Sequence, residues 1–444
     1  MFQTVELPLW LVVVVLVLAT IAAVERVLGP WLRWFLRRRM ERVVARVNAR
    51  LERKVEPFKL MQRHDMVVRL LYDPEVLEAV GEHAALTGVP GEVALSKARA
   101  YAREIVPVFS ALFYFGFATR AARALSLVFF RVRLGRVDVG LGSVDPKATV
   151  IFVMNHRSNM DYVLVTWLVA NRSAISYAVG EWARVWPLSR LVRAMGAYFI
   201  RRSSSNALYR RVLGRYIQMA TAEGITQAIF PEGRLSLDGR VGAARVGLLS
   251  FIWGAGTQAR DVVFVPVGMA YDRVLEDGLL IRAAHSKERR FRPPVLRLAW
   301  QALRVAVRRA RGRRYQFGTA AAAFGPPVSL AAFQSGGGTV EGLGMLLMSE
   351  IEKVVPVLAV PLVAAALLEG VEVASMAARL QATGAVMKLP PGGVEQAWTE
   401  GLSMLQARGI LGPDGAIRPG MAPLLGFYAA PVRQRLGLAA LPQT

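Results

Sequence analysis

His156 and Asp161 are the two residues of this sequence whose types and spacing best suit acid–base chemistry. They follow an apolar run at residues 148–154, which has the pattern of a buried strand. Side chains just past the end of such a strand are well placed for catalysis in α/β folds. With four residues between them, the imidazole could act as a general base and the carboxylate could orient it. The other interpretation is a polar turn into a helix, with Asp161 as an acid in the first turn.

Two further segments follow strand-like runs, and both carry arginine. One is the pentapeptide 230–234, Phe-Pro-Glu-Gly-Arg, and the other is 198–202, Tyr-Phe-Ile-Arg-Arg. Five arginines in and after these segments could bind a small phosphate-bearing acceptor: Arg201, Arg202, Arg234, Arg240 and Arg245. The sequence has no Gly-x-Ser-x-Gly elbow, so serine is not an obvious nucleophile. This leaves direct attack of a substrate hydroxyl on an acyl donor, with His156 taking the proton.

Four segments in a fixed order make the sequence resemble the glycerolipid acyltransferase superfamily, and within it the glycerol-3-phosphate and dihydroxyacetone-phosphate branch. The first has the form His-x4-Asp, and the four segments are 155–161, 196–203, 230–236 and 265–274. Two later segments, 324–330 and 423–429, are similar to later parts of that branch. The likeness therefore covers about residues 105–436.

The resemblance implies roles for individual residues. His156 would be the general base for the acceptor hydroxyl, and Asp161 would orient it. Three arginines would hold the acceptor phosphate: Arg201, Arg234 and Arg245, the last at a position where lysine is usual. The acceptor pocket and the acyl or acceptor cleft would be shaped by Glu232, Gly233 and Pro266.

For three residues near these motifs a structural role is also expected. Glu232 could serve only to stabilise the end of its strand. Ser158 and Asn159 are of the residue types that cap helices, and capping of the helix that follows is the role we expect for them.

From about residue 135 the sequence alternates short apolar runs with amphipathic ones, which is typical of an α/β layer domain. Strands are expected at 137–139, 149–154, 175–179, 197–200, 227–230 and 262–267, and helices at 161–169, 209–222 and 246–255. With the resemblance, the predicted fold is α/β, a central mixed sheet flanked by helices. We expect the catalytic domain at 135–335 and a helical C-terminal region at 340–444, after the break at Gly336–Gly338. The run at 355–368 predicts a buried helix.

The N-terminal part predicts a membrane attachment. Residues 7–24 are apolar enough to cross a bilayer or to lie in its surface, so 1–35 is expected to be a transmembrane or anchoring helix. Positive charge follows this run and is absent before it, which predicts a cytoplasmic catalytic domain at the cell (inner) membrane. Residues 36–134 are expected to be helical, beginning with a basic amphipathic helix at 36–55. The stretch 108–130 could pack in the core or contact lipid.

The net charge of the protein limits the classes of partner that we expect. A net charge of +24 predicts a polyanionic partner, either nucleic acid or an anionic membrane. The membrane is favoured because the arginines adjoin apolar segments, and because the basic stretch 282–314 is interleaved with aliphatic rather than stacking aromatic residues. The absence of cysteine excludes disulfides and thiolate chemistry, and four scattered histidines make a metal site unexpected.

The sequence thus predicts a membrane-bound acyltransferase without a cofactor. It would move a fatty acyl group from acyl-CoA or acyl carrier protein to the sn-1 hydroxyl of glycerol 3-phosphate, the first step of phospholipid synthesis. The alternatives are a 1-acylglycerol-3-phosphate or dihydroxyacetone-phosphate acceptor, and a non-enzymatic basic protein that binds membranes. A nucleic-acid partner is not expected, and the sequence does not indicate an oligomeric state.

Overall fold

The computed structural model describes residues 8–134, 142, 144–170, 172–180, 184–185, 188–201, 206–255, 260–285 and 317–440. Three features predicted above lie wholly or mostly outside these ranges: Arg202, the strand at 137–139 and the basic stretch 282–314. The chain divides into two compact units, Met1–Lys54 and Val55–Thr444.

The first unit consists mainly of one long helix, α1 (Leu9–Asn48), of 40 residues. The helix expected at 7–24 and most of the one expected at 36–55 are therefore parts of one continuous helix, which ends at Asn48. Several of its apolar side chains are exposed, including Trp10, Leu16 and Trp31. Apolar surface of this extent is typical of a helix that lipid or another protein covers.

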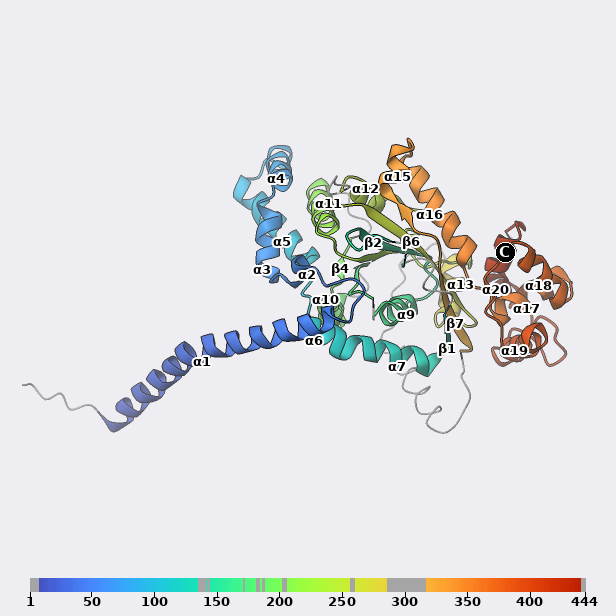
Figure 1. The fold of residues 1–444 in the computed structure, drawn as a ribbon, viewed down its shortest axis with the longest axis horizontal. Helices are drawn as coiled ribbons and strands as arrows, with labels where there is room; N and C mark the ends of the chain where they lie inside the picture. The colour runs from blue at the N-terminus through green and yellow to red at the C-terminus, as the bar shows by residue number, and fades with distance from the viewer. Residues whose placement is uncertain are drawn as a thin grey trace, which may run out of the picture. The chain divides into compact units, whose positions relative to one another are not determined.

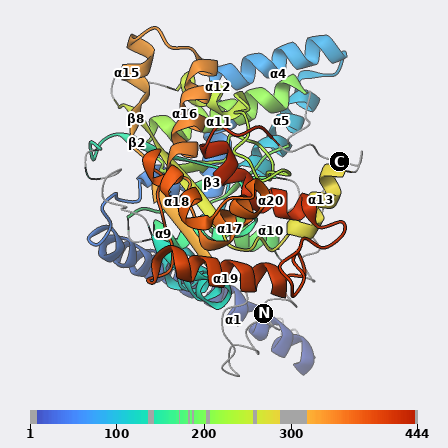
Figure 2. The same ribbon diagram turned by 90° about the vertical axis from the view of Figure 1, so that its right-hand side faces the viewer.

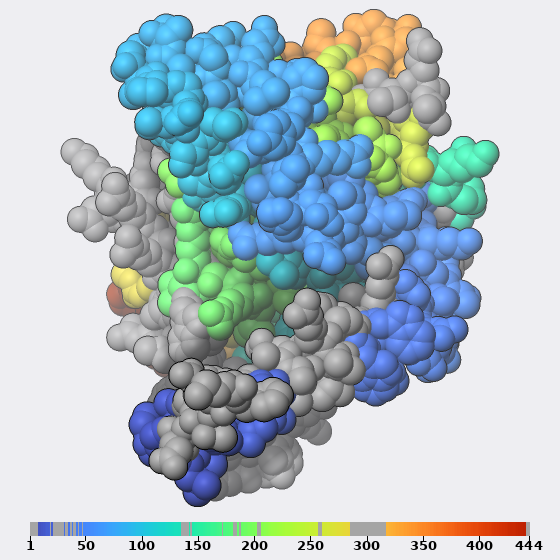
Figure 3. Space-filling view, turned by 90° about the vertical axis from the view of Figure 1, so that its left-hand side faces the viewer, coloured from blue at the N-terminus to red at the C-terminus, as the bar shows by residue number. Residues whose placement is uncertain are grey.

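Four helices open the second unit: α2 (Pro57–Leu60), α3 (Arg63–Leu71), α4 (Pro74–Thr87) and α5 (Gly91–Ile105). Asp73 caps α4 by accepting the Glu75 amide at 3.2 Å. The helix ends at Gly88, whose φ of 67° is the left-handed conformation that stops a helix. Figure 3 shows this helical region in light blue, bordering the green surface near α10 and α11.

A helical segment of 19 residues follows, formed by α6 (Ala111–Phe113), the π-helical turn η1 (Tyr114–Ala118) and α7 (Thr119–Phe129). Within the described part of the chain it is the one unbroken helix long and apolar enough to cross a membrane, a test that core helices of soluble proteins also pass. Only 28% of its apolar window is buried. Tyr114 and Ala118 lie in the core, whereas Phe117 is 59% exposed. The segment thus buries one face and leaves an apolar face uncovered.

Eight strands form one mixed sheet (Figure 1). They are β1 (Arg131–Leu134), β2 (Thr149–Met154), β3 (Ser176–Val179), β4 (Tyr198–Phe199), β5 (Gln227–Ile229), β6 (Val262–Tyr271), β7 (Thr319–Phe324) and β8 (Val328–Ser329). Their order is β1-β7-β6-β2-β5-β3-β4, with β8 beside β6. The strands β6, β2, β5, β3 and β4 run parallel, whereas β7 and β8 run antiparallel to β6. The predicted mixed sheet flanked by helices is confirmed.

The sheet separates two hydrophobic cores, and β2 shows how the sequence builds both. Val150, Phe152 and Met154 point into one core, and Ile151 and Val153 point into the other. This alternation is the period of a strand buried on both faces. The helices between the strands are α9 (Met160–Leu168), α10 (Leu188–Ala194), α11 (Ala207–Ala222), α12 (Gly247–Trp253) and α13 (Asp277–His285).

The C-terminal region is helical, as predicted (Figure 2). Its helices are α15 (Leu330–Ser335), α16 (Val340–Val354), α17 (Ala359–Glu369), α18 (Val373–Ala382), α19 (Gly393–Ala407) and α20 (Ala422–Arg435). The expected break at Gly336–Gly338 separates α15 from α16. The predicted buried helix is confirmed as α17, which begins after Pro356 and is buried over most of its length. The bent pair α17 and α18 together also passes the length and hydropathy test for a span.

Candidate active site

The parallel strands bring the first and third motifs together at one edge of the sheet. β2 and β5 are neighbours, so the segments after their carboxyl ends meet. His156 follows β2 and Glu232 follows β5. The His156 backbone amide donates a hydrogen bond to Glu232 Oε1 at 2.9 Å.

His156 and Asp161 form the predicted pair. His156 Nδ1 lies 2.9 Å from Asp161 Oδ2, and the two side chains are only 2% and 0% exposed. Asp161 Oδ2 also accepts the amides of Arg157 at 2.8 Å and Ser158 at 3.0 Å. Three donors on one oxygen suit an ionised carboxylate. When Nδ1 carries the proton and donates a hydrogen bond to Asp161, Nε2 is unprotonated and can accept a proton.

Aromatic side chains hold the imidazole from two directions. The ring stacks on Phe230 with centroids 4.2 Å apart and meets the edge of Tyr162 at 5.5 Å. In this conformation the imidazole is buried, so a substrate reaches Nε2 only when covering side chains move aside. Such a closed, dry setting strengthens the electrostatic effect of Asp161 on the ring.

Two residues that the sequence analysis did not single out complete the support of this loop. Tyr271, at the end of β6, donates its hydroxyl to Asp161 Oδ1 at 2.6 Å. Glu276 accepts Ser158 Oγ at 2.8 Å, the Asn159 amide at 3.2 Å and Asn159 Nδ2 at 3.0 Å. Tyr271 lies in the fourth motif-like segment and Glu276 two residues beyond it, and that proximity was the available signal.

The capping role expected for Ser158 and Asn159 is met in part. Ser158 Oγ accepts the Met160 amide at 3.1 Å, so it caps the start of α9. Asn159 is the N-cap residue, but its side chain makes no capping hydrogen bond and donates to Glu276 instead.

Glu232 is buried and binds backbone amides. Besides the His156 amide it accepts the Gly242 amide at 3.3 Å through Oε2. Burial raises the pKa of Glu232 to about 7, although both amides pull the pKa back down. These contacts support the structural role considered for Glu232, because the carboxylate ties the third-motif loop to the His156 backbone.

The glycine after Glu232 is required by the backbone. Gly233 has a φ of 67°, and an added Cβ would lie 2.9 Å from Arg245 Cδ. The loop closes where the Arg245 amide donates to the Pro231 carbonyl at 2.8 Å. Arg234 and Arg245 are exposed on this loop, and neither has a carboxylate partner among the described residues. Two guanidiniums therefore stand available for an anion beside the loop that carries Glu232.

The two remaining predicted site residues, Arg201 and Pro266, contact other parts of the fold. Arg201 uses its guanidinium fork to bind Glu104 of α5, with Nε to Oε1 at 2.9 Å and Nη2 to Oε2 at 2.5 Å. Pro266 is buried within β6, where its ring lies against Gly325. The structure thus gathers His156, Asp161, Glu232, Gly233, Arg234 and Arg245 around one edge, and gives Arg201 and Pro266 other neighbours.

Helix α20 braces this edge from the far end of the sequence. Arg157 is buried, stacks over the Phe427 ring at 4.5 Å and donates to the Gly239 carbonyl. Gln434 pairs with the Val241 backbone, accepting its amide at 2.8 Å and donating to its carbonyl at 3.0 Å. Both contacts fix the loop that follows the third motif.

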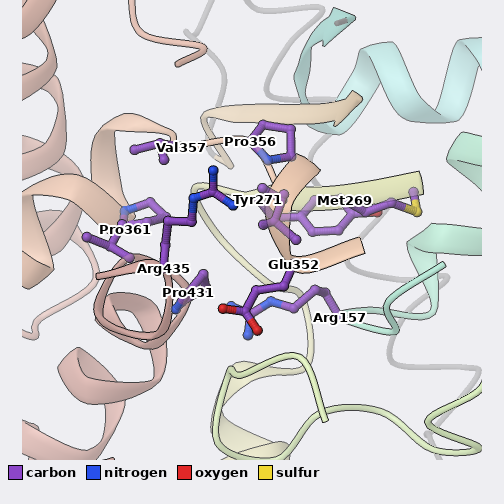
Figure 4. Close-up of a pocket in the computed structure, with 12 residues that line it drawn as sticks. Arg157, Met269, Tyr271, Glu352, Pro356, Val357, Pro361, Pro431 and Arg435 are labelled. Atoms are coloured by element: carbon purple, nitrogen blue, oxygen red, sulfur yellow. The ribbon is translucent and has the colours of Figure 1, made fainter. Parts of the chain in front are cut away.

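A small cavity lies between this brace and the sheet (Figure 4). It is lined by Arg157, Tyr271, Glu352, Arg435 and the prolines of the C-terminal region. Its volume of about 10 Å³ is room for about one water molecule and is too small for a substrate.

Comparisons with known proteins agree with the motifs. A family model described as Acyltransferase matches residues 136–270. Over 300 residues the chain is 29% identical to a glycerol-3-phosphate acyltransferase of Shewanella frigidimarina (strain NCIMB 400), covering 65% of this chain and 35% of that protein. A glycerol-3-phosphate acyltransferase of Pseudomonas entomophila (strain L48) is 29% identical over 308 residues, covering 66% and 35%. The chain therefore spans about a third of the length of these relatives.

One solved structure is similar at low identity. It is the 1-acyl-sn-glycerophosphate (LPA) acyltransferase, PlsC, from Thermotoga maritima, at 17% identity and a TM-score of 0.34, covering 66% of this chain and 97% of that one. The family model and the curated relatives match the part of the chain that carries the ordered motifs, and they support a place in the glycerolipid acyltransferase superfamily.

Proposed function

We propose that this protein transfers a fatty acyl group from a thioester donor to the sn-1 hydroxyl of glycerol 3-phosphate. The observation that carries the proposal is the buried His156–Asp161 pair, which Glu232 ties to a loop with two unpaired arginines. The curated relatives are named for this acceptor. Arg234 and Arg245 would hold its phosphate, and we leave Arg201 out of this role because Glu104 occupies its fork.

The residues perform the reaction by acid–base catalysis. Nε2 of His156 takes the proton of the acceptor hydroxyl as its oxygen attacks the thioester carbonyl. Asp161 stabilises the imidazolium that forms and keeps the ring oriented. When the tetrahedral intermediate collapses, the thiolate leaves and takes the proton from Nε2.

The proposed product and the exposed apolar surface support a membrane as a partner. The product is a lipid, and both α1 and the helix Ala111–Phe129 expose apolar side chains near arginines such as Arg38 and Arg120. We propose attachment to the cytoplasmic side of the inner membrane, with acyl-CoA or acyl carrier protein as donor.

The test uses the full-length protein in membranes. Product mass spectrometry with glycerol 3-phosphate and mixed acyl donors should show a monoacyl product, and His156→Ala should lower the rate at least about a hundredfold while the protein stays folded and membrane-bound. Full activity of that variant would end the proposal. A panel with lysophosphatidic acid and dihydroxyacetone phosphate identifies the acceptor. Tight binding to anionic vesicles without any turnover would favour the non-enzymatic alternative.

A further inference from the structure

Three arginines lie around Glu104, beside strands β3 and β4, and a fourth, Arg63 of α3, lies near one of them, Arg193. We refer to Arg63, Arg184, Arg193 and Arg201 as the arginine cluster. Arg201, just past β4, binds the Glu104 carboxylate with both ends of its fork, and Arg184, just past β3, donates to Glu104 Oε1. Arg201 is also held between the rings of Tyr101 and Tyr209, at 5.3 and 5.4 Å.

The cluster carries more positive charge than its carboxylate balances. Arg193, on α10, stacks on the Phe199 ring at 4.9 Å and makes no ion pair among the described residues. Burial lowers the pKa of Arg193, and the neighbouring charges of Arg63 and Arg184 lower it further. Among the described residues, Glu104 pairs with Arg184 and Arg201, and its charge also acts on Arg193.

Three of the four guanidiniums also have an unused donor. The Nε atoms of Arg63, Arg184 and Arg193 are buried without a hydrogen-bond partner. Buried donors of this kind are rare in folded proteins, and a bound ion or an ordered water commonly satisfies them. Like charges held together with free donors are the composition of an anion site.

The position of the cluster decides which anion fits. Arg184 and Arg201 follow β3 and β4, on the same carboxyl edge as His156 after β2, and Arg193 lies on α10 between these two strands. From β2 to β4 is three strand spacings, roughly 14 Å. An extended chain advances roughly 1.2 Å per bond, so the five bonds from hydroxyl oxygen to phosphorus in glycerol 3-phosphate span only about 6 Å. That acceptor cannot reach both places.

A thioester donor can reach both. About thirteen bonds separate sulfur from phosphorus in a 4′-phosphopantetheine arm, which spans roughly 15 Å when extended. We propose that the arginine cluster binds the phosphate of this arm, the group that acyl-CoA and acyl carrier protein share, while the thioester lies at His156. This rests on the proposed acyl transfer.

The competing interpretation is purely structural, since the Glu104–Arg201 pair also joins α5 to the sheet. A substitution of Arg193 distinguishes the binding interpretation from the structural one, because Arg193 takes no part in the Glu104–Arg201 pair. Arg193→Gln removes its charge and keeps most of its volume. The matched control is Arg379→Gln, an exposed arginine on α18 that loses the same charge far from the motifs in sequence.

The experiment compares acyl-4′-phosphopantetheine with acyl-pantetheine, which differ only in the phosphate. Wild type and Arg379→Gln should show a KM at least about tenfold lower for the phosphorylated donor, the effect of one or two charge-assisted hydrogen bonds. Arg193→Gln should lose most of that preference and keep the KM for acyl-pantetheine and for glycerol 3-phosphate. Equal KM values for the two donors in wild type would overturn the proposal.

Two further measurements compare acyl-CoA with acyl carrier protein as donors and test binding independently of turnover. Arg193→Gln should raise the KM for acyl-CoA and for acyl carrier protein alike; an effect on acyl-CoA alone would assign the cluster to the nucleotide phosphates and overturn the proposal. Calorimetric titration with 4′-phosphopantetheine itself should show binding to wild type and about tenfold weaker binding to the variant. That readout needs no turnover, so it stays decisive if the proposed reaction fails. Thermal unfolding verifies that each variant folds.

Discussion

Tyr271 donates its phenolic hydroxyl to Asp161 Oδ1 at 2.6 Å, on the oxygen that does not face His156. Tyr271 is fully buried, and burial together with the adjacent Asp161 charge raises its pKa well above the ordinary range. The phenol therefore stays protonated and remains a donor. It withdraws part of the negative charge that the imidazole would otherwise feel, which links a residue at the end of β6 to the base.

Replacing Tyr271 with Phe should lower kcat/KM, because Asp161 loses one of its donors and the carboxylate that orients His156 is held less firmly. The other charged groups around the pair, Arg157, Glu232 and Glu276, are unchanged by this substitution. We expect the rate to fall about tenfold.

Steady-state kinetics checks this expectation, with the exposed Tyr72→Phe as the matched control. An unchanged kcat/KM in the Tyr271→Phe variant would show that Tyr271 only fills space.

Glu276→Ala should destabilise the protein by about 2–3 kcal/mol, because three donors of Ser158 and Asn159 lose their buried acceptor. Glu276→Gln should cost less, since its amide oxygen still accepts from Asn159. Denaturant unfolding measures both, and the exposed Glu341→Ala on α16 serves as control. Equal stability of the Ala variant and wild type would contradict a clamp at this position.

Glu232→Gln should remove a pH dependence of stability. Because the pKa of Glu232 is raised to about 7 from an ordinary 4.5, the folded state holds the proton more tightly than the unfolded state. Stability from this group is thus full at low pH and is lost as pH rises through 7, by up to about 3 kcal/mol. Wild type should lose stability between pH 5 and pH 8 relative to the Gln variant, as measured by Tm at each pH. A difference that grows in the opposite direction would show that the two amide bonds outweigh burial.

Gln434→Ala should weaken acceptor binding from the far end of the chain. It leaves the Val241 amide and carbonyl unpaired, and Val241 belongs to the loop between Arg234 and Arg245. We expect a loss of about 1–2 kcal/mol in stability and a KM for glycerol 3-phosphate that rises several-fold, with the donor KM unchanged. Steady-state kinetics with Gln381→Ala, an exposed glutamine of α18, provides the comparison. A variant that loses stability without any change in KM would assign Gln434 to folding alone.

The predicted features that proved correct depend on local patterns. The β2 run and the close pairing of His156 with Asp161 are each visible in a few neighbouring residues, because strand period and short-range spacing are local properties. The mixed sheet followed from the resemblance to a family, since the antiparallel placement of β7 leaves no local mark.

What the sequence could not predict are contacts between distant segments. Glu104 occupies the fork of Arg201 from 97 residues away, and Tyr271 reaches Asp161 from 110 residues away. An arginine beside a motif looks the same in a sequence whether an anion or a glutamate binds it. Long-range pairing decides its role, and only the fold reveals the partner.

The stacking of Arg157 on Phe427 has a practical consequence for how the protein can be divided. Arg157 belongs to the first motif, inside the segment 136–270 that matches the family, whereas Phe427 lies more than 150 residues beyond it. A fragment cut at that boundary would leave a guanidinium facing the gap where an aromatic ring had been, next to Asp161. A fragment that keeps the local structure of the first motif must therefore retain α20.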